Sequence, residues 1–198
     1  LKVDGGGEPT LRFALKSVHP DVRREVLTEV TAQAAEPWAT PLLYEFFNDP
    51  DPGLRAEAFA AATRKTKELA PVEAALAARF ADARRLAIDA LIAKRTKAAQ
   101  ALLAKALHDP DRDLRQLALG ALVDEDAVPA LTVAAASEHP DVQARAAAAL
   151  ARHGDPAALR PLLALATAAE PTDKGQQPAW LATAEAALLG LADLADPA

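Results

Sequence analysis

Apolar residues recur along the chain at spacings of three and four positions, a pattern typical of helices with one buried stripe. Leu114, Leu117, Ala118, Ala121 and Leu122 form one such stripe. Runs with the two-residue alternation of a half-buried strand are missing, so strands are not expected. The pattern predicts consecutive helix pairs at residues 9–18 and 21–35, 37–47 and 52–64, 68–79 and 82–94, 96–108 and 111–123, 126–137 and 140–152, and 155–169 and 177–194.

The polar segments between these helices repeat with a period of thirty residues. The phrase HPDV occurs at 19–22 and again at 139–142, and Pro-Asp also occurs at 50–51 and 110–111; the turn at Phe80 has no proline. The aspartates are expected to cap the second helix of each pair, and the prolines to end the first. One pair cannot cover its own apolar stripe, so the repeat predicts stacked pairs with a continuous core. Arginine keeps the same interval, at Arg55, Arg85, Arg115 and Arg145.

These positions resemble the HEAT-repeat α-solenoid family, and particularly its short bacterial form, the phycobilisome-lyase-like HEAT repeats. That family has a proline in the first helix of each repeat, an aspartate at the turn and an arginine in the second helix. The resemblance covers about residues 19–169, and it weakens at the loop EPTDKGQQP, residues 170–178. The first repeat also departs from the pattern, with Arg23, Arg24 and Glu25 around the arginine position. The matching residues are Pro41, Asp51 and Arg55; Pro71, Asp82 and Arg85; Asp111 and Arg115; and Asp141 and Arg145.

The resemblance implies an all-α, right-handed solenoid of about six stacked helix pairs, with a ladder of Asp–Arg hydrogen bonds between neighbouring repeats. It also implies that the second helices line a concave surface that holds an extended partner. The residues support the ladder independently. An arginine that recurs in every repeat is better explained by a structural role that every repeat requires, such as pairing with aspartate, than by a single active site. We therefore expect the HPDV motif to have a structural role at the contact between repeats and not to be a functional site.

Composition narrows the classes of protein that fit. There is no cysteine, which excludes disulfides and thiolate sites. The net charge of −6 and the pI of about 5.2 disfavour a general nucleic-acid binder. No apolar run approaches the roughly 18 residues of a membrane span, so we expect no membrane segment and a cytoplasmic location. The chain has no methionine, which suggests a piece of a longer protein or a processed form, and its high content of alanine and arginine suggests a bacterial source. We expect residues 1–8 to be a flexible lead-in and residues 9–198 to form one repeat domain.

Catalytic and metal-binding patterns are weak, so we predict no enzyme, no metal site and no cofactor. The glycine run DGGGEP at residues 4–9 follows no predicted strand and lacks the Gly-Lys-Ser/Thr of a phosphate loop. The histidines are expected to interact with the C-terminal ends of helices, since repeats several units apart cannot share one metal ion. They are His19, His108, His139 and His153.

One charged feature stands out from the acidic background. Residues 64–105 contain ten lysines and arginines against four aspartates and glutamates. Six of these cations form two clusters thirty residues apart, and we expect them to form a basic edge on the stacked repeats. This edge would either complement helix C-termini or dock an acidic segment of another protein, of the same chain or of nucleic acid. The six are Arg64, Lys65, Lys67, Lys94, Arg95 and Lys97.

The function expected from the sequence is non-catalytic protein binding or scaffolding, through the concave face, the basic edge and the exposed side of the arginine ladder. The partner is another protein or another domain of the same chain. The alternatives are a nucleic-acid binder resembling the HEAT-like alkylpurine DNA glycosylases, a protein resembling the bilin lyases, and a passive spacer. The apolar final helix around Trp180 is further expected to expose a surface that another domain or copy covers.

Overall fold

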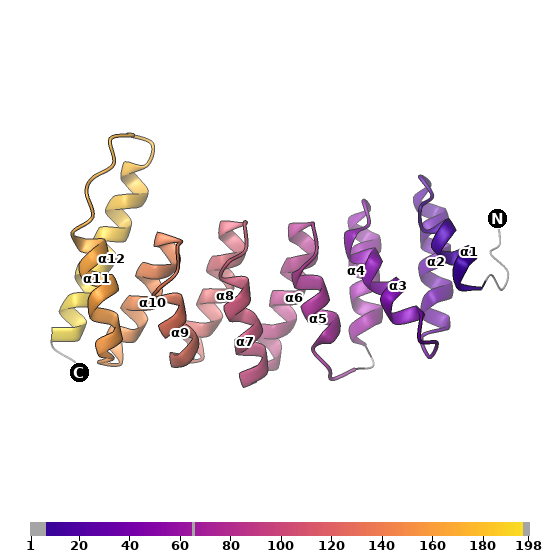
Figure 1. Cartoon of the computed structure of the whole chain (residues 1–198), viewed down its shortest axis with the longest axis horizontal. Helices are drawn as coiled ribbons and strands as arrows, with labels where there is room; N and C mark the ends of the chain where they lie inside the picture. The colour runs from indigo at the N-terminus through magenta and orange to yellow at the C-terminus, as the bar shows by residue number, and fades with distance from the viewer. Residues whose placement is uncertain (1–6, 65, 196–198) are drawn as a thin grey trace. The chain divides into compact units, whose positions relative to one another are not determined.

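The computed structural model describes residues 7–64 and 66–195, and everything in this part of the chain is helix, turn or loop. It contains twelve α-helices and two short 3-10 helices within those ranges. The chain divides into two compact units, residues 1–90 and 91–198, and the division falls inside helix α6 (Ala81–Lys94). Each unit is described by itself below (Figure 1).

Unit 1 contains three helix pairs in which a short first helix precedes a longer second helix. Its core is formed by fully buried side chains such as Leu11, Val26, Leu42, Phe46 and Leu54. Burying each side chain of this size contributes about 1.5–3 kcal/mol. The helices are α1 (Glu8–Ala14) with α2 (Pro20–Ala32), α3 (Ala39–Glu45) with α4 (Pro52–Thr63), and α5 (Ala70–Leu76) with α6; the 3-10 helix η1 (Phe46–Asn48) follows α3.

Unit 2 repeats the arrangement with three further pairs, α7 (Lys97–Ala106) with α8 (Arg112–Asp124), α9 (Val128–Ala134) with α10 (Pro140–Arg152), and α11 (Leu159–Ala166) with α12 (Gln177–Ala195). The 3-10 helix η2 (Pro156–Ala158) precedes α11. Figure 1 shows a long loop between α11 and α12. Small residues bring α12 close to α10, since a Cβ on Gly190 would lie 3.2 Å from the Cα of Ala148.

The prediction of an all-helical fold built from helix pairs is confirmed for both units. The second helices agree with the predicted ranges to within three residues at each end, whereas the first helices are shorter than predicted. Helix α1 begins at Glu8, and residues 1–6 of the predicted lead-in lie outside the described residues. The right-handed superhelix over the whole array and the single repeat domain stay predictions.

Two kinds of turn begin the second helices. In α4 the Asp51 carboxylate caps the helix and accepts hydrogen bonds from the backbone N–H of Gly53 at 2.7 Å and of Leu54 at 3.2 Å. Asp111 caps α8 in the same way, through Asp113 and Leu114. These two aspartates confirm the predicted capping role.

The HPDV turns differ, and the capping prediction is wrong for Asp21 and Asp141. Their prolines occupy the first helical position, so the N-cap residues are His19 and His139, which make no side-chain cap hydrogen bond. A serine two residues earlier stabilises each turn instead. The Oγ of Ser17 accepts a hydrogen bond from the N–H of His19 at 3.2 Å, and Ser137 accepts one from His139 at the same distance.

These turns align the repeats differently from a strict period of thirty. Asp49 accepts a hydrogen bond from the backbone of Asp51 at 2.8 Å, as Ser17 does from His19. Pro20 therefore corresponds to Pro52 and not to Pro50. The second helices begin at Pro20, Pro52, Ala81, Arg112 and Pro140, at intervals of 32, 29, 31 and 28 residues. The interval of thirty is an average.

Candidate functional site

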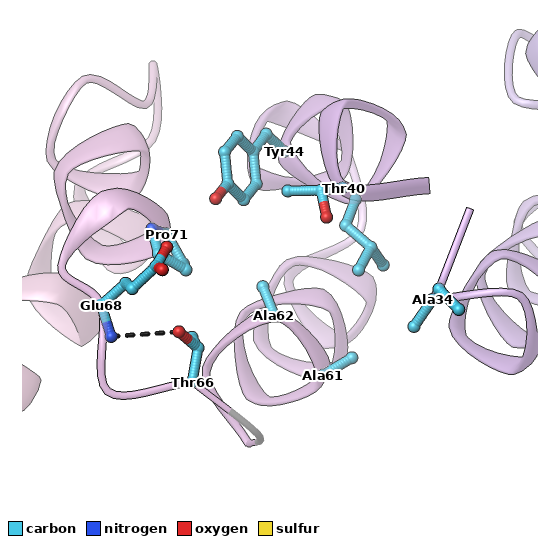
Figure 2. A pocket seen from close by; sticks show the side chains of 10 residues that line it. Ala34, Thr40, Tyr44, Ala61, Ala62, Thr66, Glu68 and Pro71 are labelled. Carbon is cyan, nitrogen blue, oxygen red and sulfur yellow. Dashed lines mark hydrogen bonds between the residues drawn. The ribbon is translucent and has the colours of Figure 1, made fainter. Parts of the chain in front are cut away.

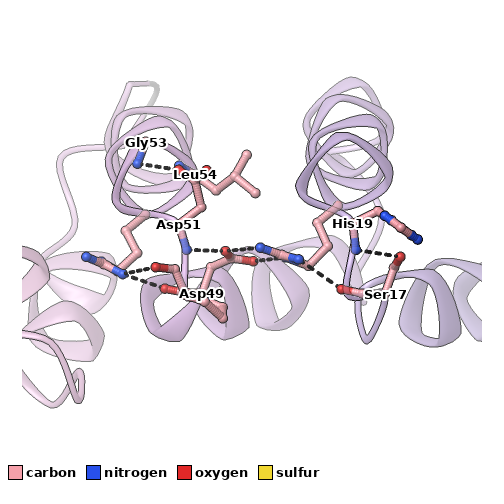
Figure 3. Close-up of polar contacts among 9 residues, drawn as sticks. Ser17, His19, Asp49, Asp51, Gly53 and Leu54 are labelled. Atoms are coloured by element: carbon pink, nitrogen blue, oxygen red, sulfur yellow. Dashed lines mark hydrogen bonds and ion pairs between the residues drawn. The ribbon is translucent and has the colours of Figure 1, made fainter.

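A buried ion pair joins the first two repeats of unit 1. The guanidinium of Arg23 on α2 donates to the carboxylate of Asp49, from Nε to Oδ2 at 2.7 Å and from Nη2 to Oδ1 at 3.0 Å. Its third nitrogen, Nη1, donates to the carbonyl of Ser17 at 2.9 Å. Figure 3 shows these contacts beside the capped turn of Asp51. The hydrogen bonds to Asp49 raise the pKa of Arg23, which keeps this buried guanidinium charged.

The same position in three later helices also holds a buried arginine. Arg55, Arg84 and Arg115 each donate from Nη1 to the two carbonyls that stand six and five residues earlier, at 2.6 to 3.3 Å. These contacts close the turn in front of each second helix. In α10 the corresponding residue is Gln143, the fourth after the N-cap His139.

The prediction that Arg55, Arg85, Arg115 and Arg145 share one structural position is therefore wrong for two of them. Arg85 and Arg145 are exposed, because the helices α6 and α10 begin earlier than a strict period of thirty requires. Arg84 takes the buried position in α6. Arg55 and Arg115 occupy it as predicted.

The aspartate that meets the buried arginine comes from two different places. Asp49 precedes its helix, whereas Asp82 and Asp141 lie in the first turn of α6 and α10. Arg55 donates from Nε to Oδ2 of Asp82 at 3.0 Å, and its Cζ lies 4.1 Å from the centroid of the Phe80 ring. In unit 2, Nη2 of Arg115 lies 3.6 Å from Oδ1 of Asp141, so this contact is longer.

The two exposed arginines contact other groups on the second helices. The side chain of Arg85 is 62% exposed, with Nε 3.7 Å from the carboxylate of Asp89. Arg145 on α10 donates from Nη1 to the amide oxygen of Gln116 on α8 at 3.1 Å, and Gln116 donates to Asp141 at 2.8 Å. Gly120 gives the Arg145 guanidinium room, since a Cβ there would lie 3.4 Å from its Nη2.

The predicted basic edge is distributed over both units. Arg64 and Lys67 follow the end of α4 in unit 1. In unit 2, Lys94 ends α6, Arg95 follows it and Lys97 begins α7. Lys65 falls outside the described residues. The edge as one surface thus stays a prediction. Arg95 has a left-handed backbone, with φ of 47°.

Unit 1 contains a recess of about 390 Å³ between α3, α4 and the connector to α5. Alanines, Leu43 and Pro71 line it, and its polar groups include Tyr44, Thr66 and Glu68. Figure 2 shows these side chains, with the Thr66 hydroxyl accepting a hydrogen bond from the backbone N–H of Glu68 at 3.0 Å. Burial, with a smaller contribution from the charge of Glu68, raises the pKa of Tyr44.

Unit 2 contains a larger recess of about 540 Å³, which we name the α12 recess. The starts of α8, α10 and α12 line it together with the end of α11 and the loop that follows. From the sequence, this loop was expected only as a departure from the repeat and Trp180 as part of an apolar final helix, whereas Arg112 and Gln116 were not identified. Its lining residues are Arg112, Pro140, Asp141, Leu165, Ala168, Ala169, Pro171, Gly175, Gln176, Trp180 and Thr183.

The outer side of α12 exposes Leu181, Leu188 and Leu189. An apolar surface on the final helix was expected, and the described residues place it there. What covers this surface stays a prediction.

Within residues 7–64 and 66–195, no group of three or more histidine, aspartate or glutamate side chains is placed to hold a metal ion. His153 contacts Asp126, with Nε2 3.0 Å from Oδ1. None of the described helices is both long enough and apolar enough to cross a membrane.

The comparison with solved structures finds proteins that are similar to this chain at low sequence identity. YibA of Escherichia coli is 17% identical over 96% of this chain and 83% of its own, with a TM-score of 0.45. Human deoxyhypusine hydroxylase in complex with glycerol is 20% identical over 96% of this chain and 86% of its own, with a TM-score of 0.47. An engineered protein is 18% identical over 91% of this chain and 96% of its own, with a TM-score of 0.33. No curated protein sequence matches the chain.

The family comparison locates the match within unit 2. A model of HEAT repeats matches residues 117–176, which run from α8 to the loop before α12. These residues are similar to the HEAT-repeat model, and the resemblance stated from the sequence was to the same family.

Proposed function

We propose that this chain is a non-catalytic protein-binding module. Its partner is another protein, or another domain of the same chain, that presents an acidic segment to the exposed side of the second helices. The observation that carries the proposal is the separation of the arginines into a buried and an exposed set. Arg55 and Arg115 are committed to turns and aspartates within the fold, whereas Arg85 and Arg145 face solvent.

Exposed arginines on a rigid helix suit the recognition of carboxylates. The guanidinium presents several N–H donors in a planar arrangement that matches a carboxylate, and arginine is enriched among residues that contribute strongly to interfaces. Arg145 is already oriented by Gln116 and by the space above Gly120, so little side-chain entropy is lost when a partner binds. The exposed cations of the predicted basic edge would add long-range attraction for the same acidic segment.

The proposal is tested with a fluorescein-labelled decaglutamate peptide and fluorescence anisotropy. We expect binding that weakens as the salt concentration rises, because exposed charges are screened. Arg145→Glu should weaken binding by about tenfold. Lys16→Glu makes the same charge change on an exposed residue outside the second helices, and it should bind like the parent protein.

A second labelled probe separates protein binding from nucleic-acid binding. A DNA oligonucleotide of similar charge should bind more weakly than decaglutamate, since the chain carries a net charge of −6. Equal binding of decaglutamate by Arg145→Glu and the parent protein, or tighter binding of the DNA, would show that the proposal is wrong.

A further inference from the structure

The α12 recess is lined by both apolar and charged side chains. The apolar ones include Leu165, Ala168, Pro171 and Trp180, and the charged ones are Arg112 and Asp141. Its volume of about 540 Å³ lies within the range of sites that hold a bulky side chain or a small ligand. The loop EPTDKGQQP contributes Pro171, Gly175 and Gln176 to the lining, and within this loop the Asp173 carboxylate accepts a hydrogen bond from the N–H of Gly175 at 2.9 Å.

Arg112 is the cation that this recess offers to a ligand. Its side chain is 68% exposed, and Nε lies 3.7 Å from Oδ2 of Asp141, which is longer than a hydrogen bond. Asp141 has closer partners, since it accepts a hydrogen bond from Gln116 at 2.8 Å and also lies beside Arg115. One carboxylate therefore meets two guanidinium groups, and the positive charge of Arg112 is not fully compensated.

Buried donors without acceptors occur in the same region. The indole N–H of Trp180 and the Nε of Arg115 are both buried and have no acceptor among the described residues. A buried donor left in this state is destabilising. In unit 1 the corresponding Nε of Arg55 donates to Asp82 at 3.0 Å. Asp141 does not accept a hydrogen bond from the Nε of Arg115, and it accepts one from Gln116 instead.

We propose that the α12 recess binds a bulky apolar side chain of a partner's acidic segment, while an adjacent carboxylate of that segment pairs with Arg112. The inference rests on the proposed function and adds the sequence character of the partner. The partner's carboxylate would pair with Arg112 and replace its weak contact with Asp141. Asp141 could then accept a hydrogen bond from the buried Nε of Arg115. A cationic ligand is disfavoured, because it would meet Arg112 while the carboxylate of Asp141 already accepts a hydrogen bond from Gln116.

The experiment uses the intrinsic fluorescence of Trp180. The chain has two tryptophans, so the variant Trp38→Phe leaves Trp180 as the reporter. Three capped hexapeptides serve as probes: Glu-Glu-Leu-Phe-Glu-Glu, Glu-Glu-Ala-Ala-Glu-Glu and Gln-Gln-Leu-Phe-Gln-Gln. We expect the first to shift the Trp180 emission and to bind about tenfold more tightly than either of the others.

Two variants then test the two parts of the recess. Arg112→Gln should weaken the first peptide about tenfold and leave the uncharged peptide unchanged. Ala168→Phe fills the recess and should remove the advantage of Leu-Phe over Ala-Ala. Circular dichroism and thermal unfolding confirm that both variants fold, as expected for substitutions at two exposed positions.

The outcomes separate this inference from the proposed function. If all three peptides bind alike, or if both variants bind the first peptide as tightly as the parent protein, the recess is not the binding site. Decaglutamate binding that still depends on Arg145 would then leave the proposed function standing. If the parent protein does not bind decaglutamate but binds the first peptide through Arg112, the proposed function is wrong. The inference that the α12 recess is a binding site would then still stand.

Discussion

Arg23 and Asp49 form a bidentate ion pair inside unit 1, with the guanidinium side chain only 7% exposed and the carboxylate 2% exposed. A buried pair of this kind is costly to break, because removal of one partner leaves a buried charge without compensation. The pair therefore decides whether the first two repeats stay joined.

We expect Asp49→Ala to lower the free energy of unfolding by about 3–5 kcal/mol. Urea unfolding followed by circular dichroism measures the change. The matched control is Glu57→Ala, which removes an ion pair with Arg24 in which both side chains are about half exposed. Exposed pairs contribute about 0–1 kcal/mol. Equal losses for the two variants would therefore contradict the conclusion that the buried Arg23–Asp49 pair stabilises the contact between the first two repeats.

Adjacent arginines on α6 should differ in their effect on stability. Arg84 is buried and donates to the carbonyls of Ala78 and Arg79 at 3.0 Å, whereas Arg85 is exposed. We expect Arg84→Ala to destabilise the protein by about 2–4 kcal/mol and Arg85→Ala by about 0.5 kcal/mol or less. Thermal and urea unfolding of the two variants compare them directly. A larger loss for Arg85→Ala than for Arg84→Ala would mean that Arg85 holds the buried position, as a strict period of thirty predicts.

The left-handed backbone at Arg95 has a cost that glycine avoids. Non-glycine residues in this region lose about 1–2 kcal/mol. We expect Arg95→Gly to raise the free energy of unfolding by about 1 kcal/mol, reduced somewhat by the greater entropy of glycine in the unfolded chain. Gly154→Ala, at the left-handed residue after α10 with φ of 66°, should act in the opposite direction. Chemical denaturation measures both, and a destabilised Arg95→Gly would contradict the prediction.

Tyr44 is the one tyrosine of the chain, so its ionisation can be followed alone by absorbance near 295 nm. Burial in the recess and the nearby charge of Glu68 raise its pKa above 10.0. The folded pKa exceeds the unfolded value, so the neutral phenol contributes stability below about pH 10, and this contribution is lost as the pH rises through the folded pKa. Glu68→Gln should lower the midpoint, and a native midpoint at or below that of the urea-unfolded chain would contradict the assignment.

The sequence was sufficient for the helix pairs but not for the alignment of the repeats. Proline and aspartate located every second helix to within three residues. They did not show that Asp49-Pro50-Asp51 and Ser17-Val18-His19 are the same turn, because different atoms make the same hydrogen bond. In front of α6 the corresponding residue is Ala78, which has no side-chain acceptor, so the sequence held no such signal that Arg84 and not Arg85 is buried.

The α12 recess and the surface arrangement of the basic edge were less predictable from the sequence than the helix pairs. The α12 recess depends on where the long loop returns to Pro140 and Asp141, and local patterns contain no information about that contact. Arg112 looked like an ordinary residue of a helix first turn. The basic edge was visible as a charge pattern, but a charge pattern does not say whether the cations of two units share a surface.

Asp49 is bound by two arginines through two different groups. Its carboxylate accepts from Arg23, and its backbone carbonyl accepts from Arg55 at 2.6 Å, while Arg55 continues to Asp82. Asp49 and Arg55 together thus connect three successive repeats. Fraying that begins at either end of unit 1 must disrupt a contact that the opposite end also needs. Unit 1 should therefore melt as one cooperative block, without populated forms in which a single helix pair has detached.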